Sequence, residues 1–362
     1  MISVKNLTRN FSSGEAEVKA LKGVSFDINS GELVAIIGKS GSGKSTLLNI
    51  LGLLDKPTDG EYAINGKNVS SVGEKQQAGL RNAVIGFVIQ DFALVEKYTV
   101  KQNVRIPLIY SKKQIDKEKA VRLVLQKVGL SDKISTPVFK LSGGQKQRTA
   151  IARAIVNEPK VLLLDEPLGA LDLKLRQEMQ YELIRLKNEL GITFLYVTHD
   201  QEEALTMSDK VVGMNRGYIQ QMGTPEEIYN EPENAFVADF IGDSNIVDGI
   251  MLEDRVVRIC GKIFPCIDEG FGKNKPVDVV IRPEDIIIGN PGSGIMDGVV
   301  TSNVFIGVHY EMCIEAGGFE WLAQNTVSYP VGSRISIDVI PENIQIMNKP
   351  QSEDEEALAL DE

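Results

Sequence analysis

The chain has 362 residues, of which 43% are hydrophobic and 25% are charged; this is the composition of an ordinary folded protein, and the length predicts about two domains. Its formal net charge is −11 at pH 7, and six of the acidic residues lie between Ser352 and Glu362, a balance that argues against nucleic acid as the main partner. Three cysteines and two histidines without metal-ligand spacing argue against a disulfide framework and a metal cluster.

The first residues and the length of the apolar runs indicate the cellular compartment. Residues 1–14 lack the charged-then-apolar pattern of a signal peptide, and no apolar run reaches the roughly 18 residues of a membrane span. The odd number of cysteines fits a reducing compartment. We therefore expect a cytoplasmic protein that reaches a membrane only through a partner.

Residues 2–26 alternate apolar and polar side chains, which predicts an antiparallel pair of strands with a turn shortly after Phe11. The ring of Phe11 has a π face on which a nucleotide base can stack. The sequence alone favours the other interpretation, in which Phe11 belongs to the core.

A glycine-rich loop at residues 38–45 fits the pattern G-x-x-x-x-G-K-[ST] at every defined position. The apolar run 33–37 before it is typical of a buried strand, and residues 46–51 after it permit a helix. Glycines let the backbone N–H groups point inward, and the helix start adds the positive end of its dipole, so this arrangement predicts a phosphate site. The alternative is a flexible linker, but a linker has no reason to end in Gly-Lys-Ser between a strand and a helix.

Two residues of the loop have candidate roles: Lys44 is placed to reach the outer phosphates of a nucleotide, and Ser45 to hold magnesium. A second apolar run, 85–89, ends in Gln90. Gln90 is either a solvent-facing strand end or an amide whose oxygen ligates magnesium and orients water. The chain from there to about Gly129 is predicted to be mostly helical, with solvated charges on 112–127.

Residues 141–148 read Leu-Ser-Gly-Gly-Gln-Lys-Gln-Arg and lead into a predicted helix that stops at Pro159. Two glycines and a serine hydroxyl at a helix start offer a second anion site, although a serine cap alone also explains them.

Two carboxylates, Asp165 and Glu166, directly follow four apolar residues at 161–164. Asp165, at the end of a buried strand, is placed to hold the magnesium of the neighbouring loop. Glu166 points to the opposite side and can act as a general base for water. Two surface acids after a strand are the alternative, which the phosphate-binding pattern upstream disfavours.

Asp172 begins a predicted helix that ends at Gly191, and the apolar run 192–197 after it leads to His199. A lone histidine is usually structural, but this one is expected at the same carboxyl edge of the sheet as the other candidates, where it can hydrogen-bond a terminal phosphate. The core face of the helix is predicted to contain Leu175, Met179, Leu183, Leu186 and Leu190.

Seven of these features occur in the order found in the nucleotide-binding subunits of ABC transporters, which the chain resembles from Met1 to about Asp243. They resemble the adenine-stacking aromatic, the Walker A loop, the Q-loop, the signature motif, Walker B with its catalytic glutamate, the D-loop and the switch histidine. In that order they are Phe11, 38–45, Gln90, 141–145, Asp165 with Glu166, 168–172 and His199.

The resemblance implies ATP and Mg²⁺ as cofactors and Glu166 and His199 as catalytic residues, and it makes Phe11 a base-stacking residue. Implied ATP-binding residues are Phe11, Gly38, Lys39, Ser40, Gly41, Ser42, Gly43, Lys44, Ser45, Thr46 and Gln90. Implied magnesium ligands are Ser45, Gln90 and Asp165, and the implied D-loop residue is Asp172. Ser142, Gly143, Gly144 and Gln145 would act on the ATP of a partner subunit.

The family's architecture implies partners as well. Two copies would close head to tail, so that Ser142 and Gly144 of one copy face the γ-phosphate held by Lys44 of the other. The dimer would lie on the cytoplasmic face of the cell membrane against two integral-membrane permease subunits, and indirectly serve a solute-binding protein.

After Tyr229, short alternating strands with Gly, Pro and Asn turns predict small β-barrels. Residues 281–285 and 305–312 are similar to the C-terminal regulatory domain of importer ATPases, and 305–312, 165–172 and 344–348 look most like the polyamine (spermidine/putrescine) importer group. Such barrels can also bind nucleic acid, which the acidic balance disfavours.

The expected fold is an α/β P-loop NTPase of the ABC type with an antiparallel β subdomain and a helical subdomain, followed by an all-β, OB-like regulatory domain. The expected limits are 1–240 for the nucleotide-binding domain, with the helical subdomain at about 91–158, then 241–350 for the β domain and 351–362 for a disordered acidic tail.

The N-terminal half carries a second resemblance: residues 48–58, 85–92 and 104–110 look more like lipoprotein-release and macrolide-export ATPases, so the chain resembles a mosaic. The favoured function is the ATPase of a polyamine importer. The alternatives are an export or lipoprotein-release ATPase, an importer ATPase for another solute such as a sugar, iron or phosphonate, and a soluble ABC ATPase outside transport.

Overall fold

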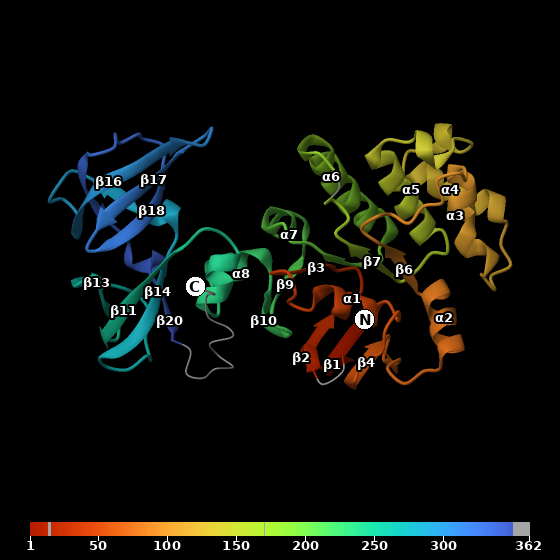
Figure 1. Ribbon diagram of the computed structural model, residues 1–362, viewed down its shortest axis with the longest axis horizontal. Helices are drawn as coiled ribbons and strands as arrows, with labels where there is room; N and C mark the ends of the chain where they lie inside the picture. The colour runs from red at the N-terminus through yellow and green to blue at the C-terminus, as the bar shows by residue number, and fades with distance from the viewer. Residues whose placement is uncertain (14–15, 170, 350–362) are drawn as a thin grey trace. The chain divides into compact units, whose positions relative to one another are not determined.

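A computed structural model describes residues 1–13, 16–169 and 171–349 (Figure 1). The chain divides into two compact units, Met1–Pro225 and Glu226–Glu362. Each unit has its own cluster of buried apolar side chains. The predicted acidic tail at 351–362 lies outside the described residues.

The first unit is built on a six-stranded sheet in the order β10-β9-β3-β8-β7-β6. All neighbours pair in parallel except β9 and β10, which are antiparallel. Its inner strands are continuous apolar runs, as expected for strands covered on both faces. The strands are β3 (Leu33–Gly38), β6 (Ile85–Val88), β7 (Val161–Asp165), β8 (Thr193–Val197), β9 (Lys210–Asn215) and β10 (Tyr218–Gly223).

A second, antiparallel sheet in this unit has the order β2-β1-β4-β5. The strand pair predicted from the alternating N-terminal pattern is therefore confirmed, and Phe11 pairs with Val18 near its turn. The strands are β1 (Ile2–Ser13), β2 (Ala16–Ile28), β4 (Asp59–Ile64) and β5 (Lys67–Asn68).

Helices complete the unit, and Figure 1 shows α3, α4 and α5 gathered in one group. The predicted helix after Asp172 is confirmed, with an Asp172 cap at its start and Gly191 in the left-handed region at its end. Of its predicted core face, Met179, Leu183 and Leu186 are buried. The helices are α1 (Lys44–Leu51), α2 (Glu74–Ala83), α3 (Val100–Ile109), α4 (Lys117–Lys127), α5 (Gly143–Ile155), α6 (Leu173–Leu190) and α7 (Gln201–Met207).

The second unit begins within α8 (Pro225–Asn230), at Glu226, and α9 (Ala235–Phe240) follows. The rest of the unit forms two five-stranded antiparallel sheets, so the predicted β-rich domain is confirmed. The sheets have the orders β13-β12-β11-β14-β20 and β15-β19-β16-β17-β18 and share one apolar core around Trp321. The strands are β11 (Asn245–Glu253), β12 (Val256–Ile259), β13 (Lys262–Pro265), β14 (Lys275–Ile281), β15 (Ile287–Gly289), β16 (Met296–Phe305), β17 (Tyr310–Ala316), β18 (Phe319–Asn325), β19 (Arg334–Asp338) and β20 (Gln345–Asn348).

Within the described residues, no helix is both long enough and apolar enough to cross a membrane.

Candidate active site

The candidate residues gather where the parallel strands of the first unit end. Strand β3 leads into the glycine-rich loop, β7 ends at Asp165, and β8 is followed by His199. Because β3 pairs with β8 and β8 pairs with β7, these three carboxyl ends lie at one edge of the sheet. This edge is where open α/β sheets bind their ligands.

The backbone of the loop requires its glycines. Gly38 has φ 155° and Gly43 has φ 101°, conformations that residues with a side chain rarely adopt. A Cβ atom on Gly38 would lie 2.1 Å from the carbonyl oxygen of Met214, and one on Gly43 would lie 2.5 Å from that of Ala20. The loop is therefore a close-packed turn rather than a flexible linker.

Helix α1 begins without a cap. Its N-cap residue is Gly43, no side chain caps its first N–H groups, and its first turn contains no acidic residue. Such a helix start carries unpaired donors and a positive dipole end, and both favour an anion. A phosphate-bearing ligand therefore fits the loop.

The ammonium group of Lys44 is buried inside the loop. Its Nζ donates to the carbonyl oxygens of Gly38 at 2.7 Å and Lys39 at 2.8 Å. Burial lowers the pKa of Lys44 from its ordinary value, while the negative charges of Glu166 and Asp165 act to raise it. The cation therefore lies within electrostatic reach of both acids.

Asp165 ends β7 half-buried, and burial together with the charge of Glu166 raises the pKa of its carboxyl group, against the influence of Lys44. Magnesium prefers oxygen ligands and usually combines one or two carboxylates with phosphate oxygens. The carboxylate of Asp165 and the hydroxyl of Ser45 are ligands of this kind. The described residues contain no cluster of three His, Cys, Asp or Glu side chains, and phosphate and water oxygens are the usual further ligands of Mg²⁺.

Glu166 is the meeting point of the site. The amide Nε2 of Gln90 donates to its Oε2 over 2.9 Å, and Nδ1 of His199 lies 3.5 Å from its Oε1. Glu166 itself has φ 43°, in the left-handed region, and its N–H donates to the carbonyl oxygen of Val197 at 2.9 Å. The strand thus breaks at Glu166, and three predicted residues from separate strand ends come together.

Behind His199 lies a charged network that the sequence did not reveal. Glu203, 2% exposed, accepts a hydrogen bond from Thr198 at 2.8 Å and faces Arg176 at 3.7 Å. Arg176 also pairs with Asp200 at 2.9 Å. Through these contacts Thr198 and Asp200, the two neighbours of His199, are held to α7 and α6. The spacing of the four residues in the sequence does not indicate that they meet.

Phe11 does not belong to the core, so the interpretation that the sequence alone favoured is wrong. The ring is 40% exposed because it lies near the turn of β1 and β2, beyond the covered part of the sheet. The guanidinium of Arg9 stacks on it at 4.4 Å and is itself held by Asp55 at 2.9 Å. The predicted contact of Phe11 with adenine stays a prediction.

The signature residues begin α5. The hydroxyl of Ser142 accepts from the N–H of Gln145 at 3.4 Å, and the Gln145 side chain accepts from the N–H of Ser142 at 3.1 Å. A Cβ atom on Gly144 would lie 2.9 Å from Leu175 of α6, so α5 and α6 pack closely there. Within one chain Ser142 is thus a helix cap, and its action on a second copy stays a prediction. Asp172 caps α6, because its carboxylate accepts a hydrogen bond from the N–H of Leu175 at 3.0 Å. Its D-loop role also stays a prediction.

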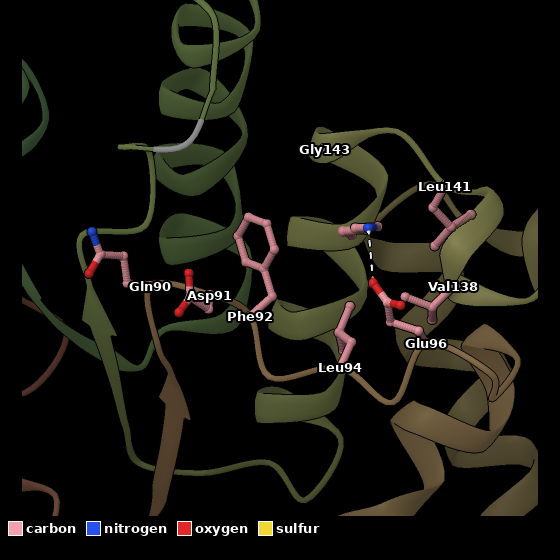
Figure 2. Close-up of a pocket in the computed structure, with 9 residues that line it drawn as sticks. Gln90, Asp91, Phe92, Leu94, Glu96, Val138, Leu141 and Gly143 are labelled. Atoms are coloured by element: carbon pink, nitrogen blue, oxygen red, sulfur yellow. Dashed lines mark ion pairs between the residues drawn. The ribbon is translucent and has the colours of Figure 1, made fainter.

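A hollow of about 310 Å³ lies between the segment after Gln90 and the start of α5 (Figure 2). Glu96, labelled in Figure 2, forms an ion pair with Lys146, whose Nζ lies 3.8 Å from its Oε1. The remaining wall combines apolar side chains with the polar Gln90 and Asp91. The lining residues are Gln90, Asp91, Phe92, Leu94, Glu96, Val138, Leu141, Gly143 and Lys146.

Comparison with known proteins points to one family. A family model described as "ABC transporter" matches residues 21–169. The chain is 51% identical to the spermidine/putrescine import ATP-binding protein PotA of Acetivibrio thermocellus, with 98% of each chain aligned. It is 49% identical to the protein of the same name from Clostridium novyi, over 96% of this chain and 98% of that one. The likeness to import proteins therefore includes the N-terminal stretches that resemble export ATPases.

Two solved structures are also similar. The dimeric ATP-binding cassette MJ0796, in a post-hydrolysis state bound to ADP and Pi, is 36% identical with a TM-score of 0.57, over 62% of this chain and 99% of that one. The cbiO1 protein of Clostridium perfringens, part of the ABC transporter complex cbiONQ, is 35% identical with a TM-score of 0.58, over 64% of this chain and 90% of that one.

Proposed function

The chain belongs to the ABC transporter family, and we propose that it is the ATP-hydrolysing subunit of an importer for polyamines such as spermidine and putrescine. The observation that carries the catalytic part is the convergence of Gln90 and His199 on Glu166, at the sheet edge that also holds Lys44. The polyamine part rests on relatives that are about half identical over nearly the whole chain.

Each residue has a distinct task in hydrolysis. Lys44 and the uncapped N–H groups at the start of α1 bind the phosphates. Asp165, Ser45 and Gln90 hold magnesium, which when bound neutralises charge on the phosphates. Glu166 accepts a proton from the attacking water, and His199 donates a hydrogen bond to the terminal phosphate. Phe11 offers its exposed ring to the adenine base.

The site is completed by a second copy of the chain in a head-to-tail dimer. In that dimer Ser142 and Gly144 meet the phosphates bound by the partner's loop. Nucleotide binding then drives closure, and hydrolysis releases it, so the binding free energy is available for mechanical work.

The membrane partners are two permease subunits, which place the dimer at the cytoplasmic face of the membrane. The hollow beside Gln90 is our proposed docking place for a permease segment, because it joins the segment after Gln90 to α5 and is lined by apolar side chains such as Phe92 and Leu94 beside polar ones. Glu96 and Lys146 at its walls would add charged contacts. Such docking would report permease movement directly to the catalytic residues.

Reconstitution tests this function. The chain is assembled in proteoliposomes with a polyamine permease pair and its binding protein, and the ATPase rate is measured with and without spermidine. We expect stimulation by spermidine and none with the Glu166→Gln chain. Stimulation only when the components of another cargo system replace the polyamine ones would reject the polyamine assignment.

A further inference from the structure

The segment just after Gln90 has an unusual backbone. Phe92 has φ 60° and Ala93 has φ 43°, and they are the only two consecutive non-glycine residues with positive φ in the described ranges. Residues with a side chain rarely enter this region, and two in succession need support from their surroundings. The N–H of Ala93 donates to the carbonyl oxygen of Asp91 at 2.6 Å, which tightens the turn further.

That support comes from Arg153 in the last turn of α5. Its Nη1 donates to the carbonyl oxygen of Ala93 and its Nη2 to that of Phe92, each over 2.6 Å. Both carbonyl groups therefore point at one planar guanidinium, whose fixed fork matches two neighbouring acceptors. The group is half-buried, and burial lowers its pKa, although arginine stays protonated at neutral pH.

Arg153 thus connects two parts of the site at a distance. Two residues before Phe92, the amide of Gln90 donates to Glu166. At the other end of α5, Ser142 caps the helix with the signature residues. Arg153 contacts neither Gln90 nor Glu166 directly, so any effect on hydrolysis acts through the backbone of Phe92 and Ala93.

We propose that Arg153 is a positioning residue for ATP hydrolysis: it holds Phe92 and Ala93 in their left-handed conformation and thereby keeps the Gln90 amide against Glu166. The inference rests on the proposed role of Glu166 as the base. Without the guanidinium, the turn relaxes toward ordinary backbone conformations and Gln90 moves away from the carboxylate.

The test is a double-mutant cycle between Arg153→Met and Gln90→Ala, read as the kcat of the full chain with Mg²⁺ and ATP. We expect Arg153→Met to lower kcat about tenfold, as expected for the loss of charge-assisted hydrogen bonds that orient a reacting group. In the Gln90→Ala background the same substitution should change kcat by less than about twofold, because its target is already gone. Arg153→Lys, which keeps the charge but loses the fork, should fall between arginine and methionine.

Arg81 provides a matched control. Its Nη1 donates to the carbonyl oxygen of Leu53 at 2.6 Å, and Leu53 is also left-handed, with φ 55°, so Arg81→Met removes a similar bond away from Gln90. It should leave kcat near the native value. Binding of a fluorescent ATP analogue should be unchanged in Arg153→Met, which separates lost positioning from lost folding.

Native turnover in either Arg153→Met or Gln90→Ala would overturn the inference. So would a double variant whose loss of kcat equals the product of the two single losses, because the two residues would then act independently. Loss of nucleotide binding in parallel with kcat in Arg153→Met would overturn it as well. Failure of the proposed base looks different, because Glu166→Gln would then hydrolyse ATP at the native rate whatever the cycle shows.

Discussion

The amide nitrogen of Gln90 donates a hydrogen bond to the carboxylate of Glu166 over 2.9 Å, although 76 residues separate the two in the chain. The contact exists because β6 and β7 are parallel neighbours, so the residues that follow them emerge at the same edge. An amide donor on one oxygen and an imidazole near the other orient the carboxylate, which a general base needs.

Replacing Glu166 with Gln should leave ATP binding intact and lower the hydrolysis rate by about 100-fold or more, the usual contribution of a positioned base. Gln has the same shape but cannot take a proton from water at neutral pH. The closed dimer should then accumulate, which light scattering with ATP and Mg²⁺ measures. Glu182→Gln, at a carboxylate that pairs with Arg185 on α6, is the control. Native turnover in Glu166→Gln would show that the base is assigned wrongly.

Replacing Lys44 with Met should weaken ATP binding by about tenfold or more, because charge-assisted contacts to phosphate are among the strongest hydrogen bonds. In the structure the ammonium donates to the carbonyl oxygens of Gly38 and Lys39, which hold it inside the loop. Equilibrium titration with ATP measures the loss. Lys22→Met, which removes an amine stacked on Tyr218, should bind ATP normally. Equal affinities in both variants would contradict a phosphate role for Lys44.

Removing magnesium with a chelator should stop hydrolysis, and Asp165→Asn should raise the magnesium concentration needed for half-maximal activity. The reason is that an amide is a weaker ligand for Mg²⁺ than a carboxylate. The measurement is the ATPase rate across a magnesium titration. An unchanged midpoint would place the ion on other ligands.

Some of this site could be predicted from local pattern alone. The loop at 38–45 depends on glycine conformations and on a lysine at a fixed offset, and both are written in consecutive residues. The cap at Asp172 and the left-handed Gly191 likewise follow from rules that act within one helix. The glycine conformations of the loop and the two ends of α6 were confirmed, because residues close together in the chain already indicate them.

Other features depend on which side chains meet across long separations, and no local pattern reports that. Arg153 reaches Ala93 across 60 residues. Phe11 was predicted to lie in the core because most phenylalanine side chains are buried, whereas its position near a turn leaves this one exposed. The left-handed backbone of Glu166 was hidden for a similar reason, since it depends on how β7 meets the end of β8.

Replacing Arg282 with Met should destabilise the second unit by about 3 kcal/mol or more, because several buried acceptors lose their donor, at a cost of about 1–3 kcal/mol each. Arg282 is 3% exposed and donates to the carbonyl oxygens of Ala238 and Tyr229, each at 2.9 Å, and to the hydroxyl of Ser244 at 2.6 Å. Urea unfolding followed by the fluorescence of Trp321, the single tryptophan, reports this unit. Arg255→Met, at an exposed pair with Glu269, is the control, and similar losses in both variants would contradict the role of the network.

Replacing Asp268 with Asn should stabilise the second unit at neutral pH. Burial raises the pKa of Asp268 above its ordinary value, although the N–H of Ile346, which donates to this carboxylate at 2.9 Å, acts to lower it. The folded state therefore keeps a proton that the unfolded chain has lost, so the free energy of unfolding falls as pH rises from the ordinary aspartate range through the raised pKa. Asn keeps the acceptor without the charge and should flatten this slope above the ordinary aspartate range. Urea unfolding at several pH values, followed by the fluorescence of Trp321, measures this slope. The control is Asp297→Asn, which keeps an exposed acceptor for the N–H of Gly292. Equal slopes in the native chain and in Asp268→Asn would contradict the prediction.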